Sequence, residues 1–125
     1  MTHITHIGRV MVPVSDQDEA IAFYTDRLGF TIAADVPFGE GDRWVEVAPP
    51  GGGANIALVP PQGDYAPGRM TGIALESTDA RSDHAELKGR GVDVDDELWG
   101  GGGVPLGFFF RDHEGNQLMI VEKQG

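Results

Sequence analysis

The chain has 125 residues and a mass of 13.4 kDa, the size of a single domain. Nine Lys and Arg against twenty Asp and Glu give a net charge of −11, which argues against nucleic acid and anionic membranes as partners, because phosphate-binding surfaces need clustered cations. The absence of cysteine excludes disulfides, thiolate metal sites and thiol nucleophiles. The sequence has no long apolar run and does not start with a basic segment followed by an apolar one, so we expect a soluble, cytoplasmic protein.

The first half of the chain predicts a strand, a helix and three further strands. Residues 7–14 alternate as a β-strand, and Asp16 is the expected N-cap of a helix that ends at Gly29. Strands are then expected at 30–34, 43–48 and 54–59, separated by turns that contain glycine or proline.

After a loop at 60–68 the same order repeats. A strand at 72–77 precedes a helix at 80–88, which Asp79 caps and Gly91 follows. Three short strands are expected at 92–94, 106–111 and 117–122. Equivalent landmarks recur about 62 residues apart, which indicates a duplicated module, with module one at about 5–60 and module two at about 69–123 of a single domain.

Two motifs give the chain a family resemblance. The stretch Val14-Ser15-Asp16, followed by Ala20, Phe23-Tyr24 and Leu28-Gly29-Phe30, resembles the opening signature of the vicinal oxygen chelate superfamily, which holds glyoxalases, bleomycin-resistance proteins and extradiol dioxygenases. The turn 110–116, Phe-Arg-Asp-His-Glu-Gly-Asn, resembles its closing motif, with His113 where proline is usual. The resemblance implies an α+β fold in which two tandem βαβββ modules form a curved mixed sheet around a concave pocket, with the helices on the outer face. It also implies a homodimer.

The resemblance also implies where a metal would bind. Members that use a divalent ion hold it with His, Glu or Gln on the first and last strand of each module. These positions correspond here to Arg9, Ala57, Gly72 and Met119. A cation repels Arg9, two of the others have no donor atom, and a thioether is a poor ligand for these metals. We therefore expect no metal at this place and no cofactor.

Strand alternation places a set of side chains on the expected pocket face. This face is mostly apolar with a few polar groups, as small-molecule sites usually are. Trp99 lies beside a glycine run at 100–103, which predicts a flexible loop at the pocket rim. The candidate ligand-binding residues are Arg9, Met11, Trp44, Glu46, Asn55, Glu76, Trp99, Phe108, Phe110 and Met119.

Arg9 is the most specific of these candidates. An arginine on an apolar face needs a partner, which here is Glu76, Glu46 or an anionic ligand. The leading functional hypothesis is a metal-independent protein that binds a small organic molecule, by analogy with resistance proteins that sequester a drug. Alternatives are a metal-dependent lyase, isomerase or dioxygenase, or a metal-free enzyme in which Glu46 or Glu76, with a pKa raised by burial, acts as acid or base.

Overall fold

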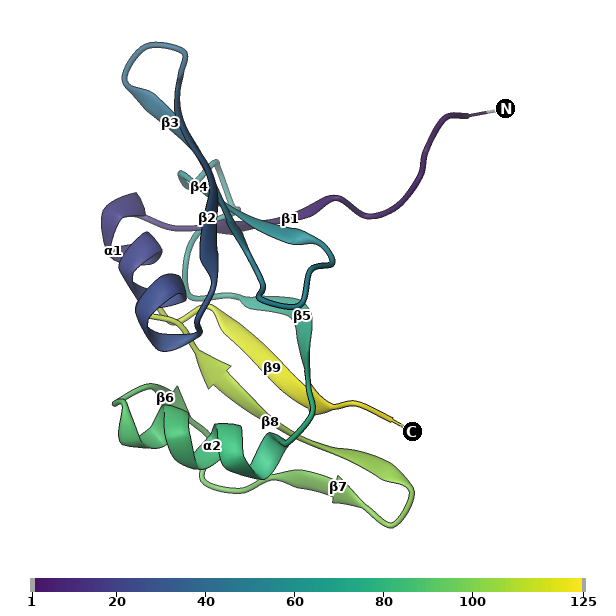
Figure 1. Cartoon of the computed structure of the whole chain (residues 1–125). Coiled ribbons are helices and arrows are strands. Elements are labelled where there is room, and N and C mark those ends of the chain that lie inside the picture. The colour runs from purple at the N-terminus through teal and green to yellow at the C-terminus, as the bar shows by residue number, and fades with distance from the viewer. Residues whose placement is uncertain (1, 125) are drawn as a thin grey trace. The chain divides into compact units, whose positions relative to one another are not determined.

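The computed structural model describes residues 2–124 and consists of two compact units, divided between Ala66 and Pro67 (Figure 1). The division falls inside the loop predicted at 60–68. The first unit contains β1 (Arg9–Pro13), α1 (Gln17–Ala22), a π-helical turn η1 (Phe23–Arg27), β2 (Thr31–Phe38), β3 (Asp42–Ala48) and β4 (Asn55–Val59).

The four strands of the first unit form one sheet in the order β1-β4-β3-β2. β1 runs parallel to β4, whereas β3 is antiparallel to both of its neighbours. β1 is therefore an edge strand, and Pro13 is its last residue, a position where a missing backbone N–H costs little.

The helix beginnings follow the predicted caps. The Asp16 carboxylate accepts a hydrogen bond from the Glu19 N–H at 3.0 Å, and the Asp79 carboxylate accepts one from the Ser82 N–H at 3.1 Å. Gly29 follows the first helical segment with φ of +77°, a conformation that costs glycine little. The caps at both ends of this segment are confirmed.

One face of the first sheet packs toward α1 (Figure 1). Arg43 marks this face, because its Nη1 donates to Asp18 of α1 at 2.8 Å. Val45 and Val47 follow Arg43 at two-residue spacing and are fully buried. Trp44 and Glu46 consequently lie on the opposite face, which we call the helix-free face of the first sheet.

The second unit repeats the topology with one additional strand. Its elements are β5 (Met70–Ser77), α2 (Ala80–Gly89), β6 (Asp93–Val94), β7 (Trp99–Gly101), β8 (Val104–Arg111) and β9 (Gln117–Glu122). The strand order is β5-β9-β8-β6, and β7 also pairs with β8. β5 runs parallel to β9, as β1 does to β4 in the first unit.

The glycine run at 100–103 lies in a β-hairpin and not in an irregular loop, while its flexibility stays a prediction. Gly101 pairs with Val104, and Trp99 pairs with Gly107 on β8. All four glycines have positive φ, which allows the strand to turn within a few residues. Trp99 is therefore carried on a paired strand, β7, and its position is fixed by the sheet.

The turn that resembles the family's closing motif is a structural element. The Asp112 carboxylate accepts hydrogen bonds from the Glu114 and Asn116 N–H groups, at 2.9 and 3.0 Å. The side-chain oxygen of Asn116, which is fully buried, accepts from the Gly68 N–H at 3.0 Å. The motif thus ties the turn before β9 to the segment that leads into β5.

These elements make the fold a mixed α+β arrangement of two sheets and two helical segments, as expected. Within residues 2–124, no helix is both long enough and apolar enough to span a membrane.

Candidate functional site

The helix-free face of the first sheet carries a cluster of polar side chains around Glu46. Glu46 on β3 pairs in register with Ala57 on β4, and Asn55, two residues before Ala57, pairs with Arg9 on β1. Trp44 lies two residues before Glu46 on β3 and therefore on the same face. Three neighbouring strands thus bring the four side chains of this cluster together.

Three donors converge on the Glu46 carboxylate. Its Oε2 accepts from the Trp44 indole Nε1 at 2.7 Å and from Arg9 Nε at 2.9 Å, and its Oε1 accepts from Asn55 Nδ2 at 3.0 Å. Only 6% of Glu46 is exposed, so these bonds replace most of the water that the carboxylate loses. The hydrogen bonds that the nearly buried Glu46 carboxylate needs are thus supplied by other side chains of the protein.

The cluster also fixes the ionisation state of Glu46. Burial acts to raise the pKa, but the hydrogen bonds from Asn55, Trp44 and Arg9, with the charge of Arg9, outweigh burial and hold the pKa of Glu46 below its ordinary value. The hypothesis that burial raises the pKa of Glu46 for acid or base chemistry is therefore wrong. Glu46 stays a carboxylate near neutral pH and organises its neighbours.

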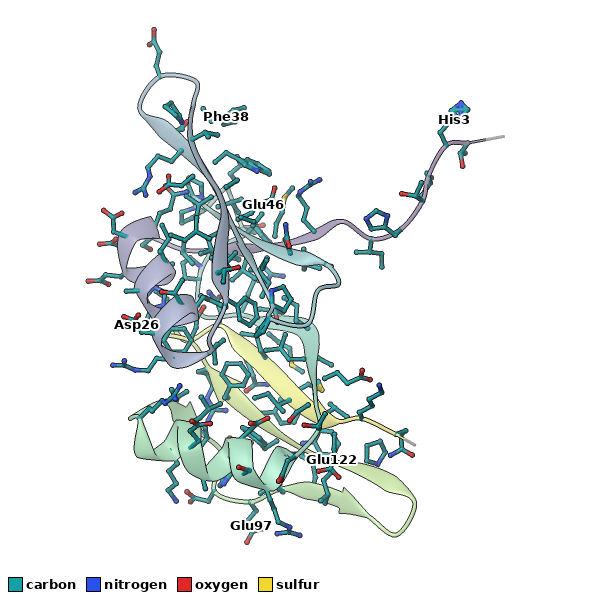
Figure 2. All side chains as sticks on the ribbon, viewed as in Figure 1. His3, Asp26, Phe38, Glu46, Glu97 and Glu122 are labelled. Atoms are coloured by element: carbon teal, nitrogen blue, oxygen red, sulfur yellow. The ribbon has the colours of Figure 1, made fainter. Side chains whose placement is uncertain are left out.

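Exposed apolar side chains flank the cluster. Met11 on β1 is 45% exposed, and Val36 and Phe38 on β2 are 51% and 60% exposed. The Phe38 ring contacts the Trp44 ring edge to face, with centroids 6.0 Å apart. Figure 2 shows Phe38 toward the tip of the β2–β3 hairpin and Glu46 further along the sheet. The first unit thus presents an apolar surface beside a fixed polar cluster.

The second unit has a helix-free face of a different composition. Phe109 on β8 pairs with Met119 on β9, and Met119 pairs with Ala74 on β5. The Trp99 ring lies 6.2 Å from the Phe109 ring and covers Gly107, where a Cβ would come within 2.6 Å of the indole. Glu76 follows Ala74 at two-residue spacing and is exposed on this face. This face is mainly aromatic and apolar.

The prediction that Phe108 and Phe110 line the pocket is wrong in its orientation. They pair with Ile120 and Leu118, and both rings are fully buried. The Phe108 ring contacts the His84 ring of α2 edge to face at 5.0 Å. Both phenylalanines are therefore core residues beneath α2, because burying two rings against a helix removes more apolar surface from water than one would. Phe109 takes the helix-free face.

The residues at the expected metal-binding positions do not fit a metal ion. The Arg9 guanidinium is a cation that already pairs with Glu46, Ala57 has no donor atom, and Met119 offers a thioether. Gly72 lies in an irregularity of the β5–β9 pairing with φ of +75°, a conformation that strains any side chain bearing a Cβ. Across the described part of the chain, no three His, Asp or Glu side chains group closely enough to hold a metal ion.

Sequence reasoning named all four residues of the first cluster and Met11 of its flank, but it missed the part of the flank that lies on β2. Trp44 and Glu46 share a face as predicted, and Arg9 donates to Glu46, one of the two carboxylates considered as its partner. Val36 and Phe38 were not foreseen because the strand was expected to end at residue 34. The alternation of apolar residues at 34, 36 and 38 was the available signal, obscured by Pro37 within it.

Comparisons with known proteins agree on one family. The family model described as "Glyoxalase/Bleomycin resistance protein/Dioxygenase superfamily" matches residues 6–120. The uncharacterized protein YetH of Bacillus subtilis is 34% identical over 122 residues, covering 95% of this chain and 99% of the relative.

Two solved structures carry the same fold. A member of this superfamily from Sphaerobacter thermophilus has a TM-score of 0.90 at 32% identity, covering 98% of this chain and all of that one. TnmS3, an antibiotic-binding protein from Streptomyces sp. CB03234, has a TM-score of 0.85 at 34% identity, covering 99% of this chain and all of its own. The chain therefore belongs to the glyoxalase/bleomycin resistance protein/dioxygenase superfamily.

Proposed function

We propose that this protein binds a small aromatic molecule without a metal ion and sequesters it, as a resistance-type member of the superfamily. The observation that carries the proposal is the Glu46 cluster. At the position where the family resemblance implies a metal ligand, this chain has Arg9, held by a hydrogen bond to a nearly buried carboxylate.

The surroundings of the cluster suit an organic ligand. Small-molecule sites combine apolar and aromatic walls with a few fixed polar groups. Phe38, Met11 and the half-buried Trp44 supply the apolar part, and the cluster supplies polar groups that need no rearrangement before a ligand arrives. Similarity to TnmS3, described as antibiotic-binding, supports the same class of ligand.

The hydrogen bonds of Glu46 favour binding over chemistry. A carboxylate that accepts from three donors and has a lowered pKa is a poor proton donor and a weak base at neutral pH. Holding Trp44 and Arg9 in fixed positions is the role that remains for it. The homodimer implied by the family resemblance stays a prediction, which light scattering on the purified protein tests.

The proposal is tested with metal-free protein. After dialysis against EDTA, thermal unfolding is followed with zinc, manganese, nickel or iron(II) ions, and then with bleomycin and a panel of aromatic antibiotics. We expect no divalent ion to raise the melting temperature and at least one antibiotic to raise it, because a ligand that binds only the folded state stabilises that state. An ion held at one per chain, or stabilisation by an antibiotic only when an ion is added, would contradict the proposal.

A further inference from the structure

Arg9 differs from two other arginines of the chain in how its guanidinium is paired. Arg43 donates through Nε, Nη1 and Nη2 to Asp35 and Asp18, and Arg111 donates through the same three nitrogens to Asp93, Asp95 and Gln117. Arg9 donates through Nε alone, to Glu46. Within residues 2–124, its Nη1 and Nη2 groups have no hydrogen-bond partner.

The Glu46 cluster fixes the position of the Arg9 guanidinium, including its Nη1 and Nη2 groups. Glu46 holds Nε at 2.9 Å, and Glu46 itself is held by Trp44 and Asn55. The Arg9 side chain is half exposed, so the four N–H donors on its two Nη atoms are open to a ligand. A guanidinium presents such donors in a planar fork that matches a carboxylate or another anionic oxygen group.

The cation is also combined with aromatic surface. The Trp44 indole donates to the same Oε2 atom as Arg9, so the indole and the guanidinium are held side by side by one carboxylate oxygen. Phe38 extends the aromatic surface beyond Trp44.

From this arrangement we infer that the ligand is an aromatic molecule with an anionic oxygen group, such as a carboxylate or phenolate, which Arg9 binds through Nη1 and Nη2. The inference rests on the proposed function and specifies its ligand class. A protein with a net charge of −11 repels anions overall, so an anionic ligand needs a cation at its binding site, and Arg9 supplies one.

The inference is tested with three matched probes: 2-naphthoate, neutral 2-naphthamide and cationic 2-naphthylmethylammonium. Binding is measured by NMR titration of backbone amides at 0.15 M salt, where charges more than about 8 Å apart are largely screened. We expect 2-naphthoate to bind about tenfold more tightly than the other two probes and to shift amides of β1, β3 and β4.

Substitutions assign the preference to Arg9. In Arg9→Met the preference for 2-naphthoate should disappear, while Arg81→Met, which removes an exposed arginine on α2, should retain it. Arg9→Met leaves Glu46 without its cation, so the double variant Arg9→Met/Glu46→Gln, which removes both charges, provides a second protein with the same expected loss. The amide spectrum of each variant shows whether it is folded.

The outcomes separate this inference from the proposed function. Equal binding of the three probes by the native protein, or a preference that persists in both Arg9 variants, would overturn the role of Arg9 while leaving small-molecule binding intact. If no probe binds the native protein and no antibiotic stabilises it, both the ligand class and the proposed function are contradicted.

Discussion

Arg9 and Glu46 are joined by a 2.9 Å hydrogen bond although their strands are not neighbours in the sheet. β4 lies between β1 and β3, and Asn55 of β4 donates to the other oxygen of the same carboxylate. The contact therefore crosses three strands on one face. It places a cation and a nearly buried anion where the family resemblance implies a metal ligand.

Replacing Glu46 should destabilise the protein in a pH-dependent way. Glu46→Gln weakens three hydrogen bonds and places an amide N–H₂ among donors, so we expect the free energy of unfolding at pH 7 to fall by about 1–3 kcal/mol. Because the folded-state pKa of Glu46 is lowered, its stabilisation is fully present above the unfolded-state pKa of about 4.3 and is lost as pH falls through the folded-state value.

Urea denaturation between pH 3 and pH 7 measures this effect. The difference between the native protein and Glu46→Gln should shrink below about pH 4.3. Glu40→Gln, in the exposed β2–β3 turn, is the matched control and should differ little from the native protein at any pH. A pH-independent difference for Glu46→Gln would show that the carboxylate charge is not what stabilises the cluster.

Gly72 should resist substitution despite open space around it. A Cβ at this position meets no atom within 4 Å, but φ of +75° is unfavourable for any other L-residue. We expect Gly72→Ala to cost about 1–2 kcal/mol of unfolding free energy. Gly8→Ala, where there is equal space and no positive φ, should cost less than about 0.5 kcal/mol, and equal costs in chemical denaturation would refute the explanation.

Gly107 should be needed to accommodate Trp99. A Cβ at Gly107 would lie 2.6 Å from the indole Cζ2 and 2.8 Å from the Ile120 carbonyl oxygen. We expect Gly107→Ala to lower the free energy of unfolding by about 1–3 kcal/mol through overpacking. Combining it with Trp99→Ala should recover part of this loss, since one of the two clashes is removed. Strictly additive effects in a double-mutant cycle would show that the two positions are independent.

Asn116 should act as a structural residue. Its side chain donates to Asp112 at 3.1 Å and accepts from the Gly68 N–H, so Asn116→Ala should cost about 1–3 kcal/mol without changing which ligands bind. Asn116→Asp keeps the shape but places a second carboxylate beside Asp112, so its stability should improve relative to the native protein as pH falls from 7 toward 5. An Asn116→Ala protein of native stability would contradict this role.

Local chemistry explains what the sequence predicted well. Asp16 and Asp79 cap their helices because an N-terminal N–H needs an acceptor nearby in the chain. Alternation placed Trp44 with Glu46 because a strand's side chains alternate whatever their surroundings. Because an unpaired charge on an apolar face is unfavourable, Arg9 was expected to have an anionic partner, and Glu46 was one of the three partners considered.

Nonlocal packing explains what the sequence did not predict. Alternation alone allows either face for the three phenylalanines at 108–110. In the structure Phe108 and Phe110 are fully buried, and the Phe108 ring contacts His84 of α2. Likewise, burial alone would raise the pKa of Glu46, and the opposite outcome depends on three donors from three strands. Glycine at 100–103 predicts a loop, and the hairpin that these residues form depends on pairing with β8, which is distant information for this segment.

Native mass spectrometry of EDTA-dialysed protein mixed with the antibiotic panel shows whether the protein binds a small aromatic molecule without a metal ion. We expect a complex with one bound antibiotic per chain and no accompanying metal mass. A complex that forms only after a divalent ion is restored, with the ion retained in it, would refute metal-independent binding.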